Sequence, residues 1–70
     1  MIDADKDAID TLLKQKGILF NELSARDNVL VIGITGELDI ESLMYVANVV
    51  YALGLKGAWL KHKTGLLWVG

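Results

Sequence analysis

The architecture of this chain depends on Asp39–Leu53, which reads DIESLMYVANVVYAL. Asp39 is a favoured residue for the start of a helix and Gly54 for its end, so we expect a helix between them. Its apolar side chains cover an arc of about 220°, whereas a helix lying on one sheet needs little more than about 100°. Because several of these residues are β-branched, an extended conformation for part of residues 43–53 is the alternative.

A second, amphipathic helix is predicted over Asp3–Lys16. Ile9, Leu12 and Leu13 fall on one narrow arc of this helix and would face the core. Acidic residues in its first turns and lysines in its last turn complement the helix dipole. Gly17 occupies the position of a left-handed cap, so the helix is expected to end there.

The remaining apolar runs predict four strands. Ile18–Ser24 and Val29–Thr35 are separated by the turn-forming residues 25–28, so we expect these two strands to pair antiparallel. Towards the end of the chain, Ala58–Lys61 and Leu66–Val69 flank the sequence His-Lys-Thr-Gly, which is typical of a hairpin turn.

These elements predict an α+β fold with the order α-β-β-α-β-β. The simplest architecture is a two-layer sandwich in which a four-stranded, mainly antiparallel sheet carries two helices on one face. A length of 70 residues with 53% hydrophobic and 23% charged residues predicts a single small domain over residues 1–70. Two helices cannot cover the sheet and also bury the whole apolar arc, so we expect an exposed apolar surface, which usually marks an interaction site.

The composition excludes several ways of stabilising so small a domain. The chain has no cysteine, which removes disulfides, and its single histidine makes a zinc site unexpected. We therefore expect no metal and no cofactor, and oligomerisation or a binding partner remains as the route to stability unless the packing is unusually good. The start, MIDADKDAID, lacks the features of a signal peptide, and no apolar run is long enough to span a bilayer. We expect a cytoplasmic protein with no membrane partner.

Charge is distributed unevenly along the chain, although the net charge is only −2. Residues 17–41 carry five acidic residues against one arginine, whereas residues 42–70 carry three lysines and no acidic residue. Such opposite ends favour a self-complementary contact and do not form the footprint of a nucleic-acid binder.

The function predicted from these features is that of a small non-enzymatic protein–protein interaction module. We expect it to act as a homo-oligomer, with a dimer favoured, or as a regulator or inhibitor of a larger protein. The expected interaction surface combines the central helix with the two tryptophans, which lie at comparable distances from the hairpin turn and are candidates for cross-strand neighbours. Its residues are Tyr45, Val46, Val49, Val50, Leu53, Trp59 and Trp68.

Single-stranded nucleic-acid binding is the alternative function. Basic side chains interleaved with aromatic rings can hold the backbone and stack the bases of a single strand. The C-terminal hairpin offers the two tryptophans together with Lys56, Lys61, His62 and Lys63. Three lysines are few for this purpose, and the acidic middle of the chain opposes phosphate.

Catalytic motifs are weak in this sequence, so we do not expect an enzyme. Gly33-Ile34-Thr35-Gly36 lies between a predicted strand and a predicted helix, where phosphate loops occur, but Glu37 and Asp39 would repel a phosphate there. His62 has two lysines and a threonine as neighbours, and no serine or cysteine is placed for activation.

Two short resemblances to known families are present. Residues 29–43, VLVIGITGELDIESL, resemble the second strand, turn and first helix of STAS domains, the anti-sigma-factor antagonist family. The later Asp-Ser-Ser-Gly type loop that carries the phosphorylated serine of that family is absent, so no functional residue is transferred. Gly54-Leu55-Lys56-Gly57 resembles the glycine loop of KH RNA-binding modules, but here the loop precedes a predicted strand.

Overall fold

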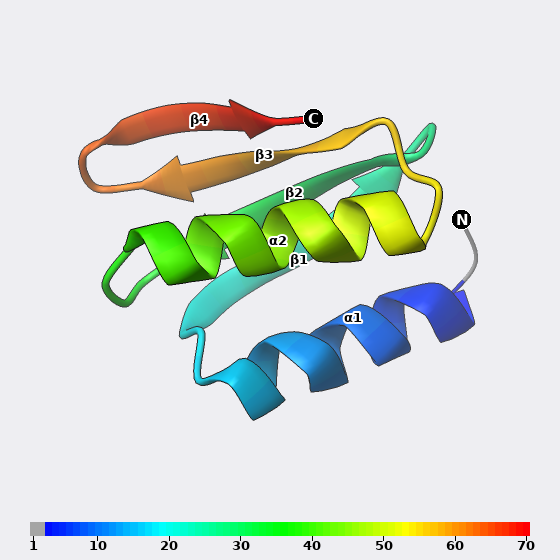
Figure 1. Ribbon diagram of the computed structural model, residues 1–70, viewed down its shortest axis with the longest axis horizontal. Coiled ribbons are helices and arrows are strands. Elements are labelled where there is room, and N and C mark those ends of the chain that lie inside the picture. Colours follow the sequence, from blue (N-terminus) through cyan, green and yellow to red (C-terminus); the bar gives the residue numbers. More distant parts are fainter. Residues whose placement is uncertain (1–2) are drawn as a thin grey trace.

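A computed structural model describes residues 3–70 of the protein, with side chains from Asp5 onward. Along the chain, the elements have the predicted order α-β-β-α-β-β (Figure 1). They are α1 (Asp3–Lys16), β1 (Phe20–Arg26), β2 (Val29–Ile34), α2 (Ile40–Ala52), β3 (Gly57–His62) and β4 (Gly65–Val69).

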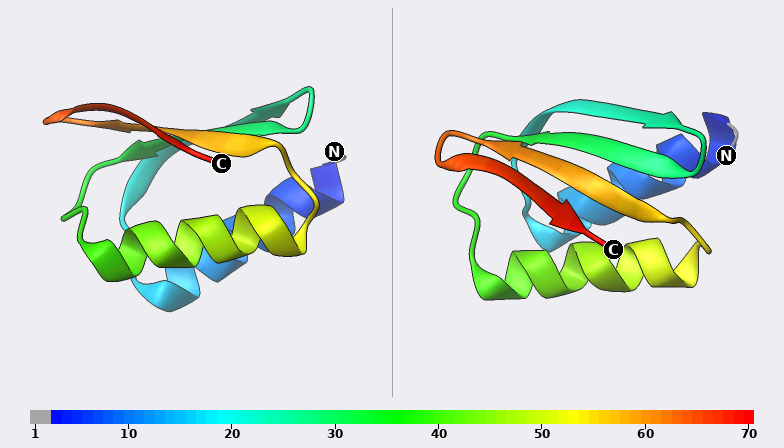
Figure 2. Two further views of the ribbon diagram at one scale, coloured as in Figure 1. Left: turned by 45° about the horizontal axis from the view of Figure 1, so that its top comes forward. Right: turned by 90° about the horizontal axis from the view of Figure 1, so that it is seen from above.

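The four strands form one sheet with the order β1-β2-β3-β4. Strand β1 pairs antiparallel with β2, and β3 pairs antiparallel with β4, whereas the central strands β2 and β3 are parallel because α2 crosses over between them. Both helices lie on the same face of the sheet, and the opposite face carries no helix (Figure 2). The predicted α+β fold with a mainly antiparallel sheet is therefore confirmed.

The turn between β1 and β2 determines where β1 ends. Asp27 and Asn28 both have positive φ angles, 53° and 64°, as the two central residues of a type I′ hairpin turn require. The turn is therefore two residues long, and β1 extends to Arg26 instead of ending at the predicted Ser24. At its other end, β1 begins only at Phe20, because the amide of Ile18 bonds to the Leu13 carbonyl oxygen and closes α1.

Helix α2 is helical throughout Ile40–Ala52, so the alternative of an extended segment is wrong. Asp39 is the N-cap residue, and its carboxylate accepts a hydrogen bond of 2.9 Å from the Ser42 backbone N–H. The Ser42 side chain and backbone together hold the pKa of the Asp39 carboxyl below its ordinary value of 3.8. Gly54, with a φ of 67°, follows the last turn as predicted.

The hydrophobic core lies between the helices and the two central strands. Its buried side chains come from both layers, and none of the described buried residues is polar or charged. They include Ile9 and Leu13 of α1, Leu30 and Ile32 of β2, Val46, Val49 and Val50 of α2, and Ala58 and Leu60 of β3. Within the described part of the chain, neither helix is both long and apolar enough to cross a membrane.

Candidate interaction surface

The register of the sheet sorts its side chains onto two faces. Leu30 and Leu60 point towards the helices and are fully buried, so their neighbours along each strand point to the helix-free face. The tryptophan face is the apolar part of that face. It consists of Val29, Val31, Trp59, Leu66 and Trp68.

Trp59 and Trp68 form the centre of the tryptophan face. They are direct cross-strand partners, as predicted, with ring centroids 4.8 Å apart and ring planes inclined by 55°. Their indoles pack against each other in a tilted arrangement, and both residues are still partly exposed to solvent, at 39% and 43%. A tilted aromatic pair of this kind is favourable in itself and forms a rigid apolar platform.

Two glycines make room for the Trp68 indole. A Cβ atom at Gly57 or at Gly70 would collide with the Trp68 ring, so both positions must lack a side chain for the indole to lie against the backbone there. From the sequence, Gly57 was expected only as the last residue of a glycine loop before a strand, although a glycine inside a strand often marks such a close approach. The missing side chains at these two glycines leave the space that the Trp68 indole occupies.

Charged residues border the tryptophan face on the side of β1. Lys61 of β3 reaches across to Glu22 of β1, with 3.3 Å between Nζ and Oε1. Arg26, which is largely exposed, lies 3.9 Å from the Asp27 carboxylate. Exposed ion pairs contribute little stability, so their main effect is to form a charged border to the tryptophan face on its β1 side.

The two edges of the sheet differ in character. Strand β4 carries no charged residue, and the exposed fractions of Leu66 and Leu67 are 62% and 41%. Strand β1, at the other edge, carries Glu22 and Arg26 and has a β-bulge near Asn21. Charges and bulges are the usual devices that keep an edge strand from pairing with another chain, and β4 lacks both.

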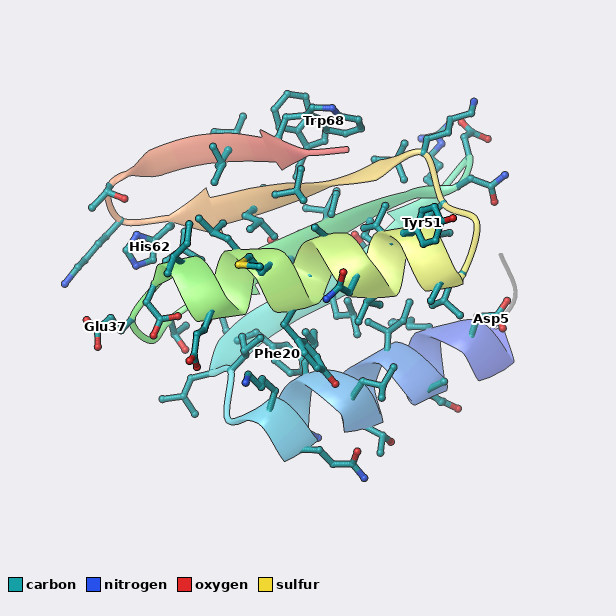
Figure 3. All side chains as sticks on the ribbon, in the orientation of Figure 1. Asp5, Phe20, Glu37, Tyr51, His62 and Trp68 are labelled. Carbon is teal, nitrogen blue, oxygen red and sulfur yellow. The ribbon has the colours of Figure 1, made fainter. Side chains whose placement is uncertain are left out.

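A second exposed apolar area lies on the outer flank of α2. Ile40, Met44 and Tyr51 are 69%, 61% and 88% exposed, so part of the wide apolar arc is indeed uncovered. Figure 3 shows Tyr51 on α2 and Trp68 on the outer strand β4. A hollow of about 190 Å³ lies between α2 and the end of β4, and its lining includes Val50, Tyr51 and Val69.

The structure places the residues of the predicted interaction surface in different surroundings. Val46, Val49 and Val50 were expected to be accessible to a partner, and this is wrong because all three are buried against the sheet. Tyr45 is half-buried between the helices, and Leu53 is 39% exposed at the end of α2.

The two predicted tryptophans lie on the helix-free face, away from α2. Sequence reasoning missed Leu66 and Leu67, although an uncharged strand at the end of a predicted hairpin was the available signal.

The basic residues of the hairpin do not gather around the tryptophans. Lys56 and Lys63 lie at opposite ends of β3, and only Lys61 shares the helix-free face. His62 points to the helix side, where its Nε2 lies 3.1 Å from the Gly36 carbonyl oxygen. That oxygen can only accept, so Nε2 donates, and Nδ1 accepts from the Thr64 hydroxyl at 2.8 Å.

The loop before α2 has no basic side chain of its own. Glu37 and Asp39 are both exposed there, and the Asp39 carboxylate already accepts a hydrogen bond from the Ser42 N–H at the start of the helix. Among the described residues, no group of three or more histidine, aspartate or glutamate side chains is arranged to hold a metal ion. In the comparisons with known proteins, no family model, no curated protein and no solved structure matches the chain.

Proposed function

We propose that the protein is a small non-enzymatic interaction module that self-associates through the tryptophan face and the adjoining strand β4. The observation that carries this proposal is the stacked, partly exposed pair Trp59 and Trp68 beside an uncharged edge strand. A cytoplasmic location belongs to the same proposal, because a chain without cysteine needs no oxidising compartment.

Tryptophan on a partly exposed face is a strong source of binding energy. Trp68 is 43% exposed, so a partner that covers it would remove on the order of 100 Å² from water, or roughly 2.5 kcal/mol, and Trp59 packs against it from the neighbouring strand. Aromatic anchors of this type dominate the affinity of interfaces, especially where charged residues lie at the rim. The Lys61–Glu22 pair supplies such a rim.

The size of the domain favours a partner as well. A chain of 70 residues without disulfides has a small core, and the described core is limited to one layer between the helices and the sheet. Covering β4 and the adjoining edge of the tryptophan face in a dimer would add apolar burial without lengthening the chain.

Sedimentation velocity across the micromolar range tests this function. We expect the wild-type protein to form a dimer and Trp68→Thr to weaken it by at least about tenfold, because the main anchor is lost. Leu66→Thr is a milder second variant, since Leu66 is 62% exposed and contributes little to the fold. Tyr51→Thr is the matched control, because it removes an exposed aromatic residue from the opposite side of the molecule.

Two results would contradict the proposal. One is a wild-type protein that remains a monomer throughout the range. The other is a dimer that Trp68→Thr and Leu66→Thr leave unchanged while Tyr51→Thr weakens it. Salt-dependent binding to a single-stranded oligonucleotide by the monomer would support the alternative function in its place.

A further inference from the structure

The backbone of β4 has a free side whose hydrogen-bonding groups can be assigned. The β3–β4 hairpin has a two-residue loop, so His62 and Gly65 exchange both of their backbone hydrogen bonds. Bonded pairs alternate along the ladder, which makes Leu60 and Leu67 the next such pair. The N–H and C=O groups of Leu66 and Trp68 therefore point away from β3, and within the described residues no strand lies beyond β4.

The stacking of the tryptophans agrees with this assignment. Trp59 and Trp68 form a non-bonded pair in this pattern, and side chains of such pairs lie closer together than those of bonded pairs. Their ring centroids are 4.8 Å apart. The free side of β4 is thus a regular, uncharged edge with two residues ready to accept another strand.

We propose that β4 pairs antiparallel with β4 of a second copy around a two-fold axis at Leu67, so that the two sheets join into one. In this register, Leu66 lies opposite Trp68 of the partner subunit, and all the outward backbone groups of both residues are used. Leu67 then lies opposite the partner's Leu67 on the helix side, which covers a side chain that is 41% exposed in the single chain. This inference rests on the proposed function and specifies its geometry.

The occupant is a second copy because the two edges of the sheet are so different. If β4 paired with β1 of another molecule, each added molecule would leave a free edge and an open chain of molecules would grow. If β4 pairs with β4 of a second molecule, the result is a closed dimer. Glu22, Arg26 and the bulge near Asn21 disfavour the open arrangement, since they protect the β1 edge.

Side-by-side pairing also fits the charges better than stacking the two sheets face to face. The helix-free face includes Glu22, Arg26 and Lys61 towards β1. Stacking of two such faces would bury these side chains, which is costly unless each finds a partner. Edge pairing leaves them in solvent and brings only the apolar β4 residues of the two subunits together.

Disulfide trapping is the direct test, because the chain contains no cysteine of its own. Residues facing each other in a non-bonded antiparallel pair have Cα atoms about 4.5 Å apart, within the range that a disulfide spans. We expect Leu67→Cys to form a covalent dimer under mild oxidation at micromolar concentration. Met44→Cys, which is also well exposed but lies on α2, is the control and should stay monomeric on a non-reducing gel.

Proline substitution tests the edge by a second route. Leu66→Pro removes an outward N–H without removing a hydrogen bond to β3, so the fold should persist while the dimer dissociation constant rises at least about tenfold. Ala25→Pro is the matched control, because by the same alternation Ala25 directs its N–H outward from the β1 edge. It should leave dimerisation unchanged, and circular dichroism reports whether both variants fold.

The outcomes separate this inference from the function on which it rests. A dimer that Trp68→Thr weakens, but that neither cross-links through Leu67→Cys nor responds to Leu66→Pro, would overturn edge pairing and leave the proposed function standing. A wild-type protein that is monomeric throughout would overturn both. Cross-linking at Leu67 together with dissociation by Leu66→Pro would establish the two-fold β4 pairing.

Discussion

The hydroxyl of Tyr45 in α2 donates a hydrogen bond of 3.2 Å to the carbonyl oxygen of Leu12 in α1. The same ring lies 5.8 Å from the Lys16 ammonium group, which also lies 3.7 Å from Glu41. Tyr45 therefore has partners within its own chain. It connects the two helices that cover the sheet.

Tyr45→Phe should lower the free energy of unfolding by about 1 kcal/mol, because the Leu12 carbonyl oxygen loses a donor at a half-buried position. Urea unfolding followed by circular dichroism measures the change. Tyr51→Phe is the control, since Tyr51 is 88% exposed and should lose nothing. Equal stability of the two variants would mean that the hydrogen bond contributes nothing.

Val49→Asp should unfold the protein instead of separating subunits. Val49 is 7% exposed and belongs to the core, so a carboxylate there would be buried without a partner, at a cost of several kcal/mol. A small domain has little stability to lose. Far-UV circular dichroism should show the loss of structure, while Asn48→Asp at the exposed neighbouring position stays folded. A Val49→Asp variant that stays folded as a monomer would show that Val49 does not belong to the core.

Gly57→Ala should disturb the tryptophan platform, because the added methyl group collides with the Trp68 ring. We expect a loss of roughly 1–3 kcal/mol in unfolding free energy and a changed near-UV circular dichroism spectrum. A double-mutant cycle with Trp68→Val isolates the contact: Gly57→Ala should cost much less when the indole is absent. Additive costs would show that Trp68 does not lie over Gly57.

The Asp39 cap predicts a loss of stability in acid. Hydrogen bonds from the Ser42 side chain and backbone lower the pKa of Asp39 in the folded state, so its contribution is present above the ordinary value of 3.8 and is lost as the pH falls through the folded value. Asp39→Asn keeps a capping side chain and should remove this part of the pH dependence. Urea unfolding at a series of pH values compares the two proteins, and identical slopes in acid would rule out a titrating cap.

Local patterns were sufficient to predict the elements. Asp3–Lys16 is helical over the predicted range, and β2 begins at Val29 as expected, because apolar periodicity and flanking cap residues are properties of neighbouring positions. The shift of β1 came from the turn. The sequence Ala-Arg-Asp-Asn does not say which two residues adopt positive φ, and in the structure they are Asp27 and Asn28.

The accessible part of α2 could not be predicted in the same way. An apolar arc of about 220° contains more than one face suited to the core, and the choice depends on how the helix rotates against the sheet. In the structure, the side of α2 with Val49 and Val50 packs against the sheet, and Met44 and Tyr51 remain exposed to solvent. For the same reason, only the three-dimensional register showed that the tryptophans lie on the face opposite to α2.

The parallel contact at the centre of the sheet has a consequence for the order of assembly. Each hairpin closes between neighbouring segments, whereas the pairing of Val29 with Gly57 joins strands that are separated in sequence by the whole of α2. Contacts between distant parts of a chain cost the most entropy and form slowly. We therefore expect the two hairpins to form early and the parallel pairing of β2 with β3 to form late. Hydrogen exchange should show the amides of the β2–β3 pairing exchanging while those within each hairpin remain protected.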